Sequence, residues 1–169
     1  MIQQLLILFF LTALPLFELR LSLPLAILGG KAIIPLTHIT FILTPIPWYI
    51  ALVAAIIANW IVAVVLYNIL DWLFLFITRF KRIHEFKERV IERARNKVHK
   101  QVHKYGMIGL ALFIGIPLPG SGVYTGALGA YALGMEKKDF YIASLIGVVI
   151  AGIAVTIITL AFSGAASLL

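Results

Sequence analysis

The chain has 169 residues, of which 62% are hydrophobic and 12% are charged, and it carries a formal net charge of +7 at pH 7. Soluble proteins are about 45–50% apolar and about 25% charged, so this composition predicts a polytopic membrane protein. The absence of cysteine excludes disulfides, iron–sulfur clusters and thiol catalysis. We expect a single all-α integral membrane domain over residues 1–169.

The first apolar stretch, Leu5–Leu14, is too short to cross a hydrocarbon core that needs about 20 residues, so it favours a re-entrant arm. It leads into Pro15–Pro24, whose flanking prolines predict a broken helix. Glu18 and Arg20 lie in this window and are two of the three charges before Asp71. In a broken, extended backbone both side chains point to one side, and we expect them to face a cavity at membrane depth.

The middle of the chain predicts a transmembrane helix followed by a surface helix. After Pro24, the run Leu25–Ile34 is predicted to return the chain to the side of the membrane from which it entered. Pro35–Pro47 is predicted to form a loop. Trp48–Ile77 is long enough to span a bilayer with tilt, and its tryptophans suit the two interfacial belts. Residues 79–105 repeat apolar side chains at close to the helical period and hold ten of the fourteen Lys and Arg. They predict an amphipathic linker helix on the cytoplasmic surface.

The same plan then begins again. Gly106–Ile116 is a second short apolar arm, which the turn Pro117–Gly122 interrupts. Val123–Leu133 is predicted to return, a basic turn with Lys137 and Lys138 follows, and Phe140–Phe162 is a second full span. The order of elements therefore matches that of the first half of the chain.

The two halves are predicted to be repeats, over residues 1–78 and 106–169, each a re-entrant helical hairpin plus a transmembrane helix. Because the basic linker joins them on one side of the membrane, the repeats are inverted, which is typical of secondary transporters. Small residues four apart let helices approach closely, so we expect the small-residue faces of the two spans to pack. These faces are Ala51, Ala55 and Asn59 in the first span, and Ala143, Gly147 and Ala151 in the second.

Glu18 and Arg20 are the charged candidates for a substrate or ion site, because ionisable residues at membrane depth are costly to keep. Glu18 can hold a transported proton, and burial would raise its pKa while the nearby arginine would lower it. Arg20 can bind a phosphate or carboxylate through its planar fork of donors. The alternative is a static ion pair that neutralises the hairpin tip.

The turn of the second hairpin is an uncharged candidate site. Its glycines let backbone amides approach a ligand closely, and the amino end of the following half-helix attracts anions. The candidate residues are Pro117, Pro119, Gly120, Ser121, Gly122, Tyr124 and Thr125. The alternative is a hairpin tip whose small residues serve packing. In the first span, Asn59 is a further polar candidate, which we expect to bond to a hairpin backbone.

The sequence gives little sign of metal or enzyme chemistry. His99 and His103 have the spacing of a zinc-binding pair, but no third ligand is in view, so we predict no metal and no cofactor. A Ser-His-acid set, paired carboxylates and a phosphate-binding lysine loop are all missing from the sequence, so we expect no enzyme. The basic run adjoins membrane segments and lacks interleaved aromatics, which favours membrane lipids over nucleic acid as its partner.

Three segments resemble a known family: PLFELR followed by LPLA from Pro15 to Ala26, IPLPGSGVYTGAL from Ile116 to Leu128, and GVVIAG in the last span. They are similar to the small multidrug export protein family, a relative of the DedA membrane proteins. The resemblance implies paired re-entrant hairpins and, for DedA relatives, movement of polyprenyl-phosphate or phospholipid headgroups driven by ion gradients. On this analogy Glu18 and Arg20 fall where functional charges are expected. DedA proteins also place arginines in the second hairpin, whereas Leu112–Leu133 carries no charge.

Together these features predict a multi-pass transporter or flippase of the inner or plasma membrane. Its substrate is amphipathic with an anionic headgroup, such as a lipid phosphate, and its transport is coupled to protons or sodium. One alternative is a proton-coupled exporter of lipophilic cationic drugs, in which Glu18 alternates between proton and drug. Another is a non-transporting membrane scaffold that recruits partners through the basic helix. Two full spans and two hairpins make a small unit, which favours a homodimer; the alternative is that the small-residue faces pack within one chain.

Overall fold

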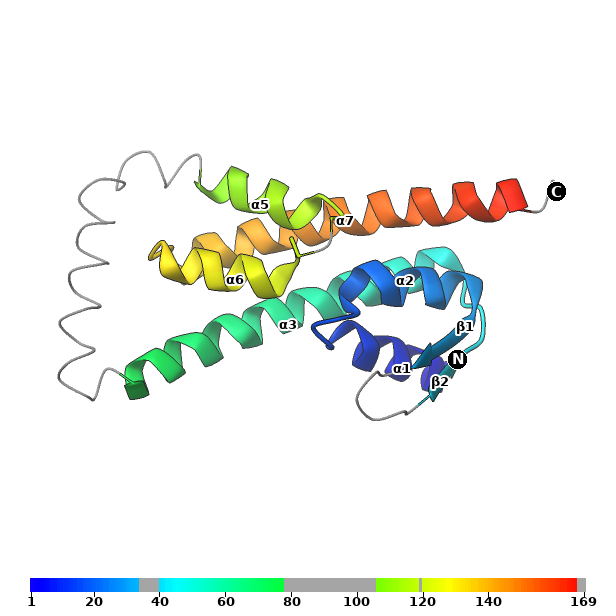
Figure 1. The fold of residues 1–169 in the computed structure, drawn as a ribbon, viewed down its shortest axis with the longest axis horizontal. Coiled ribbons are helices and arrows are strands. Elements are labelled where there is room, and N and C mark those ends of the chain that lie inside the picture. The colour runs from blue at the N-terminus through cyan, green and yellow to red at the C-terminus, as the bar shows by residue number, and fades with distance from the viewer. Residues whose placement is uncertain (34–39, 78–105, 119, 167–169) are drawn as a thin grey trace. The chain divides into compact units, whose positions relative to one another are not determined.

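The computed structural model describes residues 1–33, 40–77, 106–118 and 120–166, and this part of the chain is mostly helical (Figure 1). The predicted amphipathic helix over residues 79–105 lies outside the described residues, as does Pro119. The chain divides into two compact units. The first unit comprises Met1–Asn59 with Val148–Leu169, and the second unit comprises Trp60–Gly147.

The first unit begins with a helical hairpin, in which α1 (Ile2–Thr12) packs against α2 (Glu18–Leu28) (Figure 1). Leucines at the interface of the two helices are fully buried, among them Leu8 and Leu23. Two hydroxyls join them there, since Thr12 Oγ1 and Ser22 Oγ lie 2.7 Å apart. Each hydroxyl is also within hydrogen-bonding distance of the carbonyl one turn earlier in its own helix.

The break in this hairpin is shorter than the prolines predict. Only residues 13–17 separate α1 from α2, and Pro24 lies inside α2. Proline lacks the amide hydrogen that would bond to the carbonyl of Arg20, but membrane helices tolerate proline more readily than soluble ones do. Leu23 and Ala26 beside it are fully buried, so packing favours the continuous helix. The predicted broken backbone across Glu18 and Arg20 is therefore wrong.

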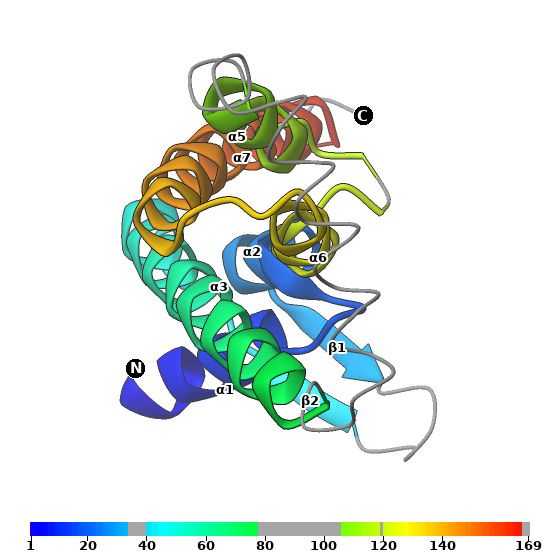
Figure 2. The same ribbon diagram turned by 90° about the vertical axis from the view of Figure 1, so that its left-hand side faces the viewer.

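The fold is mostly helical, as predicted, but a two-stranded antiparallel sheet that the sequence does not predict follows α2. Its strands are β1 (Gly30–Ile33) and β2 (Thr40–Leu43), which lie side by side in Figure 2, with Gly30 opposite Leu43. The positive φ of Gly29, 74°, ends α2 and turns the chain into β1. β-branched and aromatic residues fill β2, and they favour a strand over the predicted loop.

Two long helices are long and apolar enough to cross a membrane, within the described part of the chain. They are α3 (Trp48–Ile77), whose bounds confirm the prediction, and α7 (Lys137–Ala166), which begins three residues before the predicted Phe140. Their candidate spans are Trp48–Leu70 and Lys137–Gly164. Each long helix contributes residues to both units.

The second unit contains the other helical hairpin, α5 (Met107–Gly115) and α6 (Val123–Ala132), close to the bounds predicted for two short arms. The amino-terminal half of α7 packs against α5 through Gly147, where an added Cβ would lie 2.7 Å from the Ala111 carbonyl oxygen. On α3, Tyr67 stacks on Phe140 with ring centroids 4.3 Å apart. Its hydroxyl donates a hydrogen bond to the carbonyl of Met135.

The small-residue faces of the two spans are buried, as predicted. In the first unit Ala51, Ala55 and Ala151 are almost fully buried, and Ala143 is fully buried in the second. Close approach of helices is visible in the first unit at Gly152, where an added Cβ would lie 2.9 Å from a methyl group of Leu52. The faces thus act as packing surfaces.

Candidate functional site

Glu18 is a buried carboxylate at the first residue of α2. Its side chain is only 8% exposed. Its φ angle of 43° lies in the left-handed region, which costs about 1–2 kcal/mol for a residue other than glycine. The backbone on both sides is held, because the Glu18 amide donates to the Leu14 carbonyl and the Glu18 carbonyl accepts from Ser22 Oγ at 2.6 Å. Strained backbone that the surroundings hold in place is common at functional sites.

Arg20 is the more accessible partner of this pair. Its side chain is half-buried, and its guanidinium interacts electrostatically with Glu18. Residues two apart on a helix are separated by about 200° around its axis, so the two side chains do not share a face as an extended backbone would allow. The carboxylate is therefore buried in the hairpin, while the guanidinium retains contact with the surroundings of α2.

The turn between α5 and α6 is held together by side-chain hydroxyls. Ser121 Oγ lies 2.8 Å from the Ile116 carbonyl oxygen and 2.9 Å from that of Leu118. Thr125 Oγ1 donates to the carbonyl of Gly120 at 2.7 Å, where φ is 84°. Both hydroxyl hydrogens are thus directed to backbone carbonyls of the turn. Pro117 and Tyr124 are half-buried at either end of the turn.

Asn59 lies on the buried face of α3 and is 3% exposed. Its Oδ1 is buried, and no described residue donates a hydrogen bond to it. The hydrogen bond expected between this side chain and a hairpin backbone is therefore missing at Oδ1. The sequence predicts the burial of Asn59 from its position on the small-residue face, but not the unbonded oxygen.

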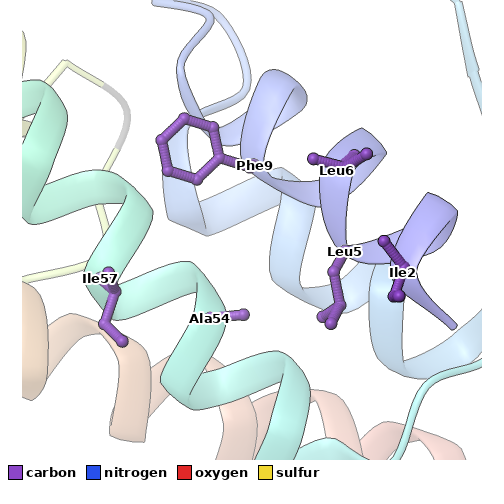
Figure 3. Close-up of a pocket in the computed structure, with 6 residues that line it drawn as sticks. All are labelled: Ile2, Leu5, Leu6, Phe9, Ala54 and Ile57. Carbon is purple, nitrogen blue, oxygen red and sulfur yellow. The ribbon is translucent and has the colours of Figure 1, made fainter.

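An apolar groove lies between α1 and the amino-terminal half of α3, within the first unit. It consists of two adjoining cavities of about 280 Å³ and about 380 Å³. Figure 3 shows six of its side chains, with α1 on one side and α3 on the other. The lining residues are Ile2, Leu5, Leu6, Phe9, Tyr49, Ile50, Val53, Ala54 and Ile57. Sequence reasoning missed this groove because nearly every residue of α1 is apolar, so no amphipathic pattern marks the exposed face.

Metal binding has no support in the described part of the chain, where no three His, Cys, Asp or Glu residues come together. His99 and His103 lie outside that part.

Two long apolar helices and a charged pair inside an apolar hairpin define a membrane protein. The chain belongs to the family described as "Putative small multi-drug export protein", whose sequence profile matches residues 18–154. The matched region begins at Glu18, the first residue of α2, and ends within α7. That description is consistent with a transporter. No curated protein and no solved structure matches the chain.

Proposed function

We propose that this protein transports an amphipathic substrate with an anionic headgroup, such as a lipid phosphate, across the plasma or inner membrane, and that it is not an enzyme. The observation that carries the proposal is the arrangement of the charged pair on α2. Glu18 is buried, whereas Arg20 is accessible enough to meet a ligand. A half-buried guanidinium beside apolar surface suits a phosphate, because it presents several donors in one plane.

The buried carboxylate makes ion coupling possible. Glu18 interacts with Arg20, so an anion that binds the guanidinium weakens that interaction and favours proton uptake by the carboxylate. Substrate release restores the pair and favours loss of the proton. In this scheme the gradient drives transport through one carboxylate, with no covalent chemistry and no cofactor.

The apolar part of the substrate has a candidate path in the same unit. The groove between α1 and α3 is lined by aliphatic side chains together with Phe9 and Tyr49. Aliphatic walls suit an acyl or prenyl chain, and tyrosine is typical of the membrane–water interface. A second, inverted copy of the hairpin-plus-span plan in residues 106–169 belongs to the same proposal, as does the relationship to DedA proteins.

Export of lipophilic cations is the second candidate function. It is favoured by the family description and by the buried carboxylate of Glu18, which can neutralise a cation in an apolar site. Arg20 two residues away opposes it, because a like charge repels a cationic substrate. The two candidates therefore differ in which member of the pair contacts the substrate.

Reconstituted liposomes can separate these candidates. We would measure the movement of a fluorescent short-chain lipid phosphate, with and without a pH gradient, for the wild type and for Glu18→Gln, Arg20→Ala and Arg20→Lys. Lys31→Gln is the matched control, because Lys31 is an exposed cation of β1 in the same unit. Ethidium, a lipophilic cation, would be tested in parallel.

For anionic transport we expect wild type and Lys31→Gln to move the lipid, Arg20→Ala to abolish movement, and Arg20→Lys to restore part of it. Glu18→Gln should remove the dependence on the pH gradient. Movement of ethidium that Arg20→Ala preserves and Glu18→Gln abolishes would replace this proposal with cation export. If every variant matched empty liposomes for both probes, the scaffold alternative would take precedence over transport.

A further inference from the structure

Asn59 is a polar side chain at the centre of a membrane-spanning helix. It lies midway along the candidate span Trp48–Leu70, and it is only 3% exposed. On the same face of α3, Ala51 and Ala55 are fully buried. This amide therefore lies on a buried face of small residues, midway along the candidate span.

The oxygen of this amide stands apart from the other buried polar groups. Among the described residues, Asn59 Oδ1 is the buried side-chain oxygen or nitrogen that has no hydrogen-bond partner. Buried hydroxyls of the same unit, such as those of Thr156 and Thr159, donate to carbonyls of their own helix. An unbonded carbonyl in an apolar interior is unfavourable, so such a group calls for an explanation, and a ligand that supplies the missing donor is one.

We infer that Asn59 Oδ1 accepts a hydrogen bond from a hydroxyl group of the transported molecule as its headgroup crosses the middle of the membrane. The inference rests on the proposed function and narrows the substrate to anionic headgroups that carry an O–H donor. A neutral amide oxygen is an acceptor only, so a substrate without a donor leaves it unbonded and gains nothing from it. The Asn59 carbonyl thereby selects headgroups that carry a hydroxyl, while Arg20 attracts their negative charge.

A ligand-binding role and a structural role of Asn59 predict opposite effects of its substitution on thermal stability. Leucine has nearly the shape of asparagine and no polar atom, so Asn59→Leu removes the unbonded oxygen and should raise the midpoint of thermal unfolding by about 2 to 4 °C. If Oδ1 were bonded within the protein, the same change would lower the midpoint.

Asn68→Leu is the matched control on the same helix. Asn68 Nδ2 donates to Tyr141 Oη at 2.8 Å and to the Val64 carbonyl, and its Oδ1 accepts from Lys137 Nζ at 3.2 Å. The same substitution therefore breaks existing hydrogen bonds there, and it should lower the unfolding midpoint.

Substrate specificity is tested by measuring how fast two fluorescent short-chain lipids of equal charge cross the liposome membrane. Phosphatidylglycerol has hydroxyls in its headgroup, and phosphatidylmethanol has none. Wild type should move the first faster than the second by about five- to tenfold. Asn59→Leu should abolish that preference, Asn68→Leu should keep it, and Arg20→Ala should abolish movement of both lipids.

Each outcome decides a different point. A preference that survives in Asn59→Leu, or an unfolding midpoint that this variant lowers, overturns the role of Asn59 and leaves anionic transport standing. Equal movement of both lipids by the wild type also overturns it. If the wild type moves neither lipid, or Arg20→Ala behaves as wild type, the proposed function fails and the inference fails with it.

Discussion

The contact of Gly147 with α5 allows a sharp test of how the second unit is packed. An added Cβ at Gly147 would lie 2.7 Å from the Ala111 carbonyl oxygen and 2.7 Å from Cβ of Ile114. Both neighbours are fixed, one being backbone and the other the branch point of a buried side chain that is 2% exposed. Gly147→Ala therefore requires α5 and α7 to move apart.

The expected loss of stability follows from two opposing effects. Overpacking a filled interface costs about 1–3 kcal/mol, and the rigid neighbours of Gly147 favour the upper end of that range. The higher helix propensity of alanine relative to glycine stabilises the helix by about 1 kcal/mol. Gly147→Ala should therefore lower the free energy of unfolding by about 2 kcal/mol, the remainder of these two terms.

Two other glycines of the same unit serve as controls. At Gly126 an added Cβ would lie 2.8 Å from Cγ1 of Ile114 and 2.9 Å from its Cδ1, atoms that rotation of the side chain can move. Gly126→Ala should therefore be close to neutral. At Gly129 nothing lies within 4 Å, so Gly129→Ala should gain about 0.5–1 kcal/mol from helix propensity alone.

Unfolding of the purified protein in mixed micelles, followed by circular dichroism while the denaturing detergent is increased, gives these three values. The order of stability should be Gly129→Ala, wild type, Gly126→Ala and then Gly147→Ala. A Gly147→Ala variant as stable as Gly129→Ala would refute the close contact between α5 and α7.

Two further predictions concern hydrogen bonds inside single units. Tyr67→Phe removes the hydroxyl that donates to the Met135 carbonyl at 2.5 Å, and it should cost about 0.5–1.5 kcal/mol in the same unfolding assay, with the ring stacking on Phe140 retained. An unchanged unfolding curve would mean that this hydroxyl bonds to solvent. Thr12→Val and Ser22→Ala should each cost a similar amount, but the double variant should cost less than their sum by about 0.5 kcal/mol or more, because the two hydroxyls bond to one another. Strict additivity would contradict that contact.

The sequence predicts well the parts of the fold that have long apolar stretches bounded by proline or glycine. Pro47 directly before Trp48 marks the start of α3, and a mostly apolar stretch of 30 residues defines its length. The turn from Pro117 to Gly122 likewise separates α5 from α6 at the predicted place. Burial of Ala55 and Ala143 follows from the four-residue spacing of small side chains.

The errors arise where tertiary packing overrides a local preference. Pro24 suggests a break, yet the buried Leu23 and Ala26 keep α2 helical around it. β1 and β2 are four residues each, and strands this short are hard to distinguish from an interfacial loop without knowing that they pair. The unbonded oxygen of Asn59 depends on which neighbours surround it, and no sequence pattern encodes that.

The hydroxyls that bond within their own helices bear on how the protein enters the membrane during synthesis. Thr12, Ser22, Thr156 and Thr159 each have the carbonyl one turn earlier as a partner, so their polarity is already masked before any two helices meet. Segments carrying them can leave the translocation machinery singly at little cost. By contrast, Asn59 Oδ1 in α3 has no hydrogen-bond partner among the described residues. We therefore expect α3 to stay beside the translocation machinery until the first unit has assembled around it.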